Sequence, residues 1–299
     1  MTRFLYLSPH LDDVVLSAGG AIASRLEAGD EVVVATVFSG PPNSEECEEA
    51  LLYSERRAED QKAISQLIAQ GSSPCEAHYL GLADAPFRDS RYSSFDAIIN
   101  GPSSTDTETR GTLRARLCEV VKREAPDVLV SPLAVGRHID HRLVFEECAA
   151  LNWEGERRFY EDRPYAFVPG AVNRRWASVG AHPESFQAEQ TLKAYPQGSF
   201  LAGYRNDADT QRDTREVQRW RWNNNLFEQT RMVPTERQVR RRTLAIAAYE
   251  SQLAALFDAV PETAEEAIDA LYNDKPEVEW RVCAPPLPAA VVTLPAKES

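Results

Sequence analysis

The N-terminal segment limits what this chain can fold into, because an expected buried strand there ends directly in ionisable side chains. The apolar run FLYL (residues 4–7) is typical of a buried strand. His10, Asp12 and Asp13 follow closely, and an apolar pattern with helical spacing then runs over 13–28. Imidazole and carboxylate groups are unfavourable in a dry interior unless they find partners. These three side chains therefore need partners from elsewhere in the chain.

Strand-like and helix-like segments alternate through the first half of the chain. Strands separated by helices pair in parallel with right-handed crossovers, so this order predicts a layered α/β fold. The β-branched run EVVVATVF (residues 31–38) has the composition of a buried parallel strand. The other expected strands are 4–8, 78–80 and 127–131, and the other expected helices are 45–69 and 113–124, with an extended loop over 84–109.

The second half shows weaker periodicity. We expect strands over 158–160 and 176–179, and helices over 183–195 and 234–257. Residues 205–225 are polar and contain two tryptophans, and are candidates for a segment that covers a site or packs on the sheet. Residues 1–284 show no domain boundary, which predicts a single domain. The proline- and alanine-rich segment 285–299 is expected to be an extended or disordered tail.

Charge and cysteine content argue against several classes of protein. The formal net charge of −13 disfavours non-specific nucleic-acid binding and docking on anionic lipid. The five cysteines are widely spaced and odd in number, which favours reduced thiols over disulfides or a thiolate metal site. The sequence has no signal-peptide pattern and no apolar run long enough to span a bilayer, so we expect a cytoplasmic protein.

A second cluster of histidine and carboxylate side chains follows another expected strand. The segment DVLVS (residues 127–131) leads through a short loop to His138, Asp140 and His141. Ligands of open α/β sheets bind beyond the carboxyl ends of the strands, so the two clusters meet if their strands lie close together. Two imidazoles with one carboxylate form a facial triad with open positions, which suits a catalytic zinc or ferrous ion.

The groups that remain fit the hydrolysis of an amide. A carboxylate beside the metal can take a proton from bound water, and the spare histidine can stabilise an oxyanion or protonate a leaving amine. A structural interpretation competes with this one. Asp12-Asp13 and Asp140 can each serve only as helix N-caps.

These motifs resemble those of the N-acetylglucosaminylphosphatidylinositol de-N-acetylase family, also called PIG-L or LmbE-like. SPHLDD (residues 8–13) is similar to its (A/P)HPDD signature, and GRHIDH (residues 136–141) is similar to its HxDH signature. Between them, SERRAEDQKAISQL and LGLADA resemble a helix and a short turn of the family. FYEDRPYAF and LAIAAYESQL resemble stretches of one bacterial branch, so the resemblance covers most of residues 3–257.

The resemblance implies a fold, a reaction and roles for individual residues. The implied fold is a Rossmann-like three-layer α/β fold with a mostly parallel central sheet, and the implied reaction is zinc-dependent removal of an acetyl group from an amino sugar or related amine. Asp12 would be the general base that acts on the metal-bound water. His138, oriented by Asp140, would stabilise the oxyanion or assist the leaving amine. The implied metal ligands are His10, Asp13 and His141.

Three further residues are implied to contact the substrate. Arg56 and Asp84 match family positions that contact the sugar, with Arg57 as an alternative to Arg56. A local ion pair on the helix and a turn position are the structural alternatives for Arg56 and Asp84. Arg137 stands where the family frequently has glycine. Its charge would meet a phosphate or carboxylate of the substrate, or pair with Asp140.

The leading hypothesis is therefore a metal-dependent N-deacetylase, a hydrolase of linear amide C–N bonds whose small-molecule substrate is an acetylated amino sugar or glycoconjugate. Zinc is the expected cofactor, and ferrous iron fits the same ligands. One alternative is a zinc-dependent amidase that removes another N-acyl group from a natural-product intermediate. Another is a non-catalytic sugar- or nucleotide-binding module, which the lack of a GxGxxG pattern after the first strand disfavours. A homo-oligomer is compatible with the sequence.

Overall fold

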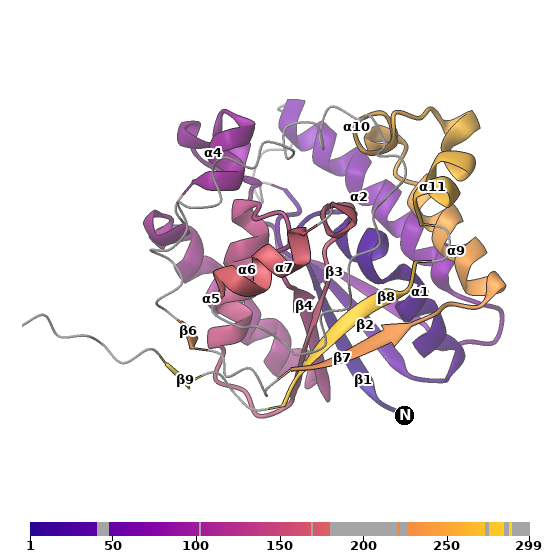
Figure 1. Cartoon of the computed structure of the whole chain (residues 1–299), viewed down its shortest axis with the longest axis horizontal. Helices are drawn as coiled ribbons and strands as arrows, with labels where there is room; N and C mark the ends of the chain where they lie inside the picture. Colours follow the sequence, from indigo (N-terminus) through magenta and orange to yellow (C-terminus); the bar gives the residue numbers. More distant parts are fainter. Residues whose placement is uncertain are drawn as a thin grey trace, which may run out of the picture.

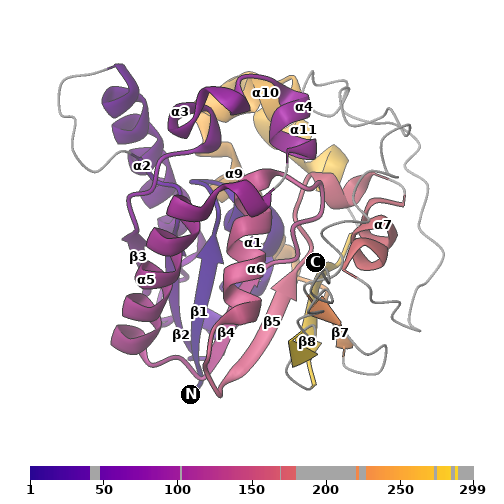
Figure 2. The same ribbon diagram turned by 90° about the vertical axis from the view of Figure 1, so that its left-hand side faces the viewer.

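A seven-stranded sheet forms the centre of the protein in the computed structural model, which describes residues 1–40, 48–101, 103–168, 170–179, 220–221, 227–272, 275–283 and 287–288. The strand order is β3-β2-β1-β4-β5-β8-β7 (Figures 1 and 2). Neighbouring strands from β3 to β5 pair in parallel, whereas β8 pairs antiparallel with β5 and β7. The strands are β1 (Arg3–Ser8), β2 (Glu31–Thr36), β3 (Cys75–Tyr79), β4 (Val128–Pro132), β5 (Glu156–Tyr160), β7 (Phe227–Met232) and β8 (Glu277–Val282).

Helices cover both faces of the sheet, because side chains along each parallel strand alternate between two apolar cores. Phe4 and Tyr6 of β1 belong to the core beneath one helical layer, and Leu5 and Leu7 belong to the core beneath the other. The first layer contains α1 (Asp13–Glu27), α2 (Glu48–Leu67), α9 (Glu236–Ala247) and α11 (Ala264–Tyr272), and the second contains α5 (Thr107–Glu124) and α6 (Ile139–Ala150). The expected Rossmann-like three-layer fold with a mostly parallel sheet is confirmed.

The two strands that carry the predicted clusters are neighbours. β1 pairs in parallel with β4, with Phe4 opposite Val128 and Tyr6 opposite Val130. β1 also pairs with β2 on its other side, so the chain changes direction across the sheet at β1. Such a switch point is where open α/β sheets place their ligand sites. Figure 2 shows the carboxyl ends of β1 and β4 at the top of the sheet, away from the N-terminus.

The expected loop over 84–109 contains several short helices, which lie near the carboxyl edge of the sheet (Figure 2). Short periodic stretches of this kind are hard to distinguish from loops in sequence, and tertiary contacts stabilise them here. Tyr92 is buried, and its hydroxyl donates to Asp106 at 3.1 Å. The short helices are α3 (Ala85–Arg88), η1 (Ser90–Tyr92), α4 (Phe95–Asn100) and η2 (Ser103–Thr105).

The strand expected over 176–179 is wrong, because Trp176 lies in helix α7 (Ala171–Ser178). Its side chain is fully buried and packs edge-on against Phe227 and Trp280 of the antiparallel strands. The aromatic and β-branched composition of 176–179 therefore reflects tertiary burial and not a strand. The antiparallel strands β7 and β8 were not expected at all. Strand β5 contains the expected 158–160.

The helix expected over 234–257 is interrupted after Ala247. It consists of α9, the short turn η9 (Glu250–Gln252) and α10 (Leu253–Phe257). Two further short turns are η3 (Tyr165–Phe167) and η10 (Pro261–Thr263), and β6 (Trp220–Arg221) pairs with β9 (Leu287–Pro288). The expected helix 183–195, most of 205–225 and most of 285–299 lie outside the described residues. No helix in the described part of the chain is long and apolar enough to cross a membrane.

The YESQ stretch (residues 249–252), which follows α9, is hydrogen-bonded to Asp60 and Glu59 of α2. The Tyr249 hydroxyl donates to Asp60 at 2.7 Å, and the Tyr79 hydroxyl donates to the other oxygen of Asp60 at 3.0 Å. The backbone N–H and the hydroxyl of Ser251 both donate to Glu59, each at 2.7 Å. Asp60 is 1% exposed. Burial raises the pKa of Asp60 to about 6, although the two tyrosine hydroxyls oppose the shift.

The raised pKa of Asp60 predicts that the free energy of unfolding depends on pH. The folded state binds the Asp60 proton more tightly than the unfolded state, so ionisation of Asp60 lowers the free energy of unfolding as pH rises through about 4 to 6. Asp60→Asn lacks this ionisation. Its free energy of unfolding relative to wild type should rise by about 2 kcal/mol between about pH 4 and pH 7, measured by urea unfolding. A difference that stays constant over this range would contradict the prediction.

Candidate active site

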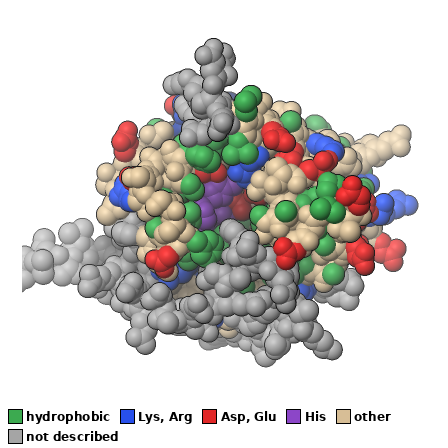
Figure 3. Space-filling model, turned by 90° about the horizontal axis from the view of Figure 1, so that it is seen from above, with side chains coloured by type: hydrophobic (Ala, Val, Ile, Leu, Met, Phe, Trp, Pro, Cys, Tyr) green, Lys and Arg blue, Asp and Glu red, His purple; other side chains and the backbone are tan. Residues whose placement is uncertain are grey.

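The predicted residues lie in a hollow at the carboxyl edge of the sheet, where Figure 3 shows histidine side chains bordered by charged and hydrophobic groups. The turn after β1 is tightly fixed. The Ser8 hydroxyl donates to the His10 carbonyl at 2.6 Å and accepts from the Val14 backbone N–H at 3.1 Å. The Asp13 carboxylate accepts from the His10 backbone N–H at 2.8 Å. The strand end thus presents His10 and Asp13 in a fixed relative orientation.

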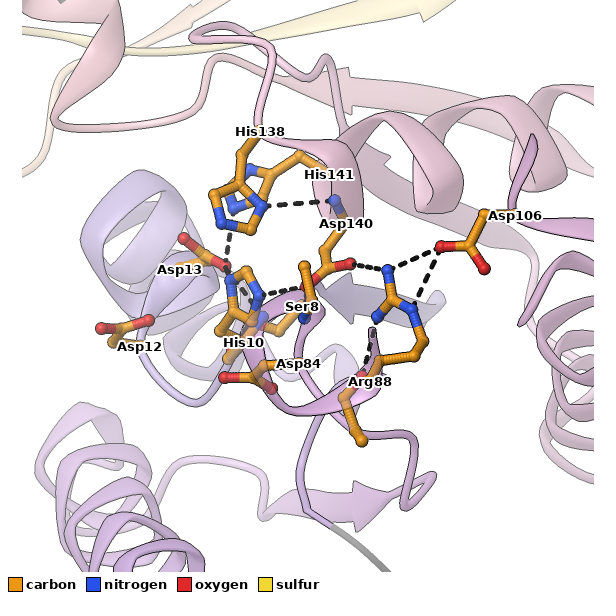
Figure 4. A network of polar contacts seen from close by, with 12 residues as sticks. Ser8, His10, Asp12, Asp13, Asp84, Arg88, Asp106, His138, Asp140 and His141 are labelled. Carbon is orange, nitrogen blue, oxygen red and sulfur yellow. Dashed lines mark hydrogen bonds and ion pairs between the residues drawn. The ribbon is translucent and has the colours of Figure 1, made fainter. Parts of the chain in front are cut away.

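The three expected metal ligands converge on one point. Asp13 Oδ2 lies 3.1 Å from His10 Nδ1 and 3.2 Å from His141 Nε2 (Figure 4). His10 and Asp13 come from the end of β1, and His141 comes from the first turn of α6, which follows β4. The pairing of β1 with β4 therefore brings together Asp13 and His141, which are 128 positions apart in the sequence.

In His10 and His141, one ring nitrogen faces Asp13, and the other, outer nitrogen contacts a second carboxylate. His10 Nε2 lies 3.0 Å from Asp140 Oδ2, and His141 Nδ1 lies 2.7 Å from Asp162 Oδ1. In the neutral form that binds a metal, a ring that donates its N–H to this carboxylate keeps a lone pair on its inner nitrogen, the one that faces Asp13. Metal-binding histidines are commonly held in this way, which fixes the tautomer and the ring orientation.

Asp162 was not predicted as a site residue. It lies in the loop after β5, and its second oxygen accepts from the Val135 backbone N–H at 2.9 Å, so it holds the loop after β4 as well as His141. That loop contains Gly136 at a φ of +90°, where an added Cβ would lie 2.2 Å from the Tyr165 ring. The available signal was the FYED stretch, which was recognised by resemblance but without an assigned role.

The charges around the convergence point favour a bound cation. Burial opposes the charged form of His141, but Asp13 and Asp162 raise its pKa to about 9. Nearby carboxylates, including Asp84, also raise the pKa of His10 well above its usual value despite its burial. Although burial opposes ionisation of Asp13, the two histidines hold its pKa well below its usual range. An added positive charge is therefore stabilised here, and a divalent ion bound by two imidazoles and a carboxylate would supply it.

His138 lies beside this cluster, and its pKa is shifted in the opposite direction from those of His10 and His141. Ligand nitrogens of His10, His138 and His141 lie within 4.8 Å of one another, so a site of three histidines is also geometrically conceivable. However, His138 Nδ1 accepts from the Asp140 backbone N–H at 3.2 Å, and burial together with the charge of His10 lowers its pKa well below its usual value. A neutral His138 in this tautomer carries its proton on Nε2. In this state His138 would act as a hydrogen-bond donor, which favours Asp13 over His138 as the third ligand.

The structure corrects the predicted role of the Asp140 side chain. Its carboxylate contacts the His10 ring, the Ala85 backbone N–H at 2.9 Å and Arg88 at 2.7 Å. Among the described contacts, only the backbone N–H of Asp140 contacts His138. The Asp140 carboxylate was expected to orient His138, and it orients His10 instead. Sequence could not distinguish these two targets, because both histidines are within reach of an Asp at this position. The N-cap residue of α6 is His138 and not Asp140, and the His138 side chain makes the cap hydrogen bond.

Asp12 and the two predicted sugar-binding residues, Arg56 and Asp84, form a group of charged side chains beside the cluster. Arg56 is 3.8 Å from Asp12 and 3.5 Å from Asp84, whereas Arg57 donates to the Ser39 carbonyl at 2.7 Å, so Arg56 is the arginine that faces the site. The Asp12 side chain makes no cap hydrogen bond to α1. Burial and the charge of Asp13 raise the pKa of Asp12 to about 6, with Arg56 opposing the shift.

Arg137 stays a predicted substrate contact. It is half-buried and precedes His138 in the loop between β4 and α6, with a φ of +63°. A non-glycine residue in the left-handed region is uncommon and is typical of a tightly constrained loop.

The fold and the site together define an α/β protein with a histidine–carboxylate cluster at a sheet switch point, and part of the chain matches a known family. Residues 5–151 match the model of the PIG-L family, described as GlcNAc-PI de-N-acetylase. This segment of the chain, just under half of its length, is therefore similar to the PIG-L family.

Two curated relatives carry the same name. The chain is 32% identical over 177 residues to a 2'-N-acetylparomamine deacetylase of Streptomyces fradiae, an alignment that covers 57% of this chain and 60% of that protein. It is 25% identical over 193 residues to a 2'-N-acetylparomamine deacetylase of Niallia circulans, covering 54% of this chain and 67% of that protein. The match thus spans less than two thirds of the Streptomyces relative.

Solved structures support the fold over nearly the whole chain. A deacetylase of the teicoplanin biosynthesis pathway has a TM-score of 0.60 and 22% identity, with 94% of this chain and 98% of that chain covered. An A40926 pseudoaglycone deacetylase has a TM-score of 0.58 and 22% identity, with 97% and 98% covered.

The contact between Asp162 and His141 predicts that Asp162 governs metal retention. Asp162→Asn leaves one oxygen to accept from two donors, the His141 ring and the Val135 N–H, so the hold on the ring loosens. Zinc affinity should fall by about 10–100-fold in chelator competition. Glu161→Gln is the matched control, since the neighbouring Glu161 accepts from the Trp280 ring and touches no site residue among the described contacts. Equal zinc affinity in Asp162→Asn and wild type would contradict the prediction.

Proposed function

We propose that this protein is a zinc-dependent N-deacetylase that removes the acetyl group from an N-acetylated amino sugar within an aminoglycoside-like or glycopeptide-like intermediate. The observation that carries the proposal is the convergence of His10 Nδ1, Asp13 Oδ2 and His141 Nε2, with a carboxylate behind each histidine. The match of residues 5–151 to the PIG-L family model and the names of the two curated relatives support the reaction and the substrate class.

The donor set fits the proposed metal. Two neutral imidazoles and one carboxylate leave open positions for water and substrate, as in catalytic and not structural zinc sites. When bound by His10, Asp13 and His141, zinc would polarise the amide carbonyl and lower the pKa of a water molecule. Ferrous iron accepts the same donors, so the ligand set alone does not select zinc. A zinc-inhibited form is known for the structurally similar teicoplanin deacetylase.

Two side chains of this protein are placed to move protons and to stabilise charge. Asp12 would accept a proton from the water whose oxygen attacks the amide carbon. His138 would donate its Nε2–H to the amide oxygen as negative charge develops there. When the C–N bond breaks, the proton is delivered to the amine nitrogen, and the products are acetate and the free amine.

Arg56 and Asp84 would bind the sugar next to the reacting amide. Arg56 lies between Asp12 and Asp84, so it links the general base to the predicted sugar contact. Arg56 Nε and Asp84 Oδ1 are buried and have no hydrogen-bond partner among the described residues. Buried polar atoms are normally paired, and the hydroxyl groups of a sugar can both donate and accept. Arg137 would meet an anionic group of the substrate if one is present.

The proposal is tested by acetate release from 2'-N-acetylparomamine and N-acetylglucosamine with the zinc-loaded protein. Asp12→Ala should retain zinc but lose about 10²–10⁴-fold in kcat, because it removes the general base and no metal ligand. Asp127→Asn is the matched control, an exposed carboxylate at the opposite, amino end of β4, and should leave kcat unchanged.

Three results would contradict the proposal in different ways. Loss of zinc from Asp12→Ala would exchange the roles of ligand and base. Release of longer acyl groups without release of acetate would assign an N-acyl amidase. Sugar binding without zinc and without acetate release would assign a binding module.

A further inference from the structure

The Arg88 side chain connects the metal site to a second carboxylate that the proposed reaction does not use. Arg88 is the last residue of α3, and its guanidinium donates to Asp140 Oδ1 at 2.7 Å. The same group donates to Asp106 Oδ2 at 2.9 and 3.1 Å and to the Ala83 carbonyl at 2.8 Å. Figure 4 shows Arg88 between Asp140 and Asp106, on the far side of Asp140 from His10.

The two oxygens of the Asp140 carboxylate accept hydrogen bonds from different groups. Oδ2 accepts from His10 Nε2 at 3.0 Å and from the Ala85 backbone N–H at 2.9 Å, and Oδ1 accepts from Arg88. Asp140 is completely buried. A buried carboxylate needs a cationic partner and full hydrogen bonding to remain in place. Rotation of this carboxylate would turn the His10 ring, whose Nδ1 faces Asp13.

We propose that Arg88, held by Asp106, is a positioning residue for the metal site: it fixes the Asp140 carboxylate against His10 and thereby aims His10 Nδ1 at the metal. The inference rests on the metal site of the proposed function but not on the identity of the substrate. Among the described contacts, Arg88 reaches His10 through Asp140 and through the Phe38 ring, which lies 5.1 Å from the Arg88 guanidinium and 5.9 Å from the His10 ring. It touches neither the converging ligand atoms nor Asp12 among these contacts.

The geometry requires arginine at this position. The planar guanidinium donates in three directions, to Asp140, Asp106 and Ala83, and stacks over the rings of Phe38 and Tyr92 at 5.1 and 5.4 Å. A lysine ammonium is a single point of charge and cannot span two carboxylates in this plane. Arg88→Lys should therefore retain charge but loosen Asp140.

Arg110 provides a matched control on the same face of the sheet. Its guanidinium also bridges two carboxylates, Glu146 and Glu147, and donates to the Ser103 carbonyl. Its side chain is 10% exposed and that of Arg88 is 13% exposed, so the burial is closely similar. Glu146 and Glu147 lie on α6 beyond the site residues. Arg110→Lys imposes the same chemical change without reaching His10.

The experiment compares Arg88→Lys and Arg110→Lys in the full chain. Zinc affinity is measured by competition with a chelator, and the visible absorption spectrum is recorded with cobalt(II) in place of zinc. Arg88→Lys should bind zinc about 10–100-fold more weakly and change the cobalt spectrum. Arg110→Lys should change neither. Urea unfolding of both metal-free variants measures the loss of stability that the two substitutions share.

Asp106→Asn keeps the inference testable if Arg88→Lys does not fold. It removes one of the carboxylates that hold Arg88 and leaves the contact of Arg88 with Asp140 intact, so zinc should bind more weakly than in wild type but more tightly than in Arg88→Lys. Wild-type zinc affinity in the folded Arg88 or Asp106 variant would overturn the inference, as would equal losses in Arg88→Lys and Arg110→Lys. These results leave the proposed function standing. Lack of zinc binding by wild type would overturn both.

Discussion

The parallel pairing of β1 with β4 is the constraint on which the site depends. It places the turn after β1 and the start of α6 at one edge of the sheet, so that Asp13 lies 3.1 Å from His10 and 3.2 Å from His141. Neither strand could carry such groups within its own length, because both strands are fully covered by helices. The chemistry therefore occupies the first residues after the strands, where the two helical layers leave an opening.

Carboxylates contact both ring nitrogens of His10 and of His141, and their effects differ with the nitrogen that they contact. Asp13 faces the inner nitrogens of both rings, whereas Asp140 and Asp162 each hold an outer nitrogen. In the proposed metal site, the inner carboxylate would contribute charge, and the outer pair would fix the tautomers and the directions of the rings. His138 Nδ1 accepts a backbone N–H and has no carboxylate partner there, while burial together with the charge of His10 lowers its pKa well below its usual value. In the proposed function, the partners of each histidine thus decide whether it serves as a metal ligand or as the donor to the oxyanion.

The sequence was sufficient for features that depend on local pattern and much less so for contacts between distant segments. Alternating apolar strands and helices predicted the parallel part of the sheet, and the two histidine motifs predicted which side chains converge. Nothing local distinguished the target of the Asp140 carboxylate, or marked Arg88 and Asp162, because their partners lie 52 and 21 residues away. Trp176 appeared strand-like because it is buried, although its backbone is helical. The order of β5, β8 and β7 arises from antiparallel pairing that carries no parallel-strand pattern.

The most direct test of the metal site is elemental analysis of the wild type beside His141→Ala and His138→Ala, each purified after zinc loading. The proposed function takes His141 as a ligand and His138 as a hydrogen-bond donor, although the ligand nitrogens of His10, His138 and His141 all lie within 4.8 Å of one another. We expect one zinc per chain in wild type and in His138→Ala, and none in His141→Ala. Absence of zinc from wild type, or its loss from His138→Ala with retention in His141→Ala, would contradict this arrangement.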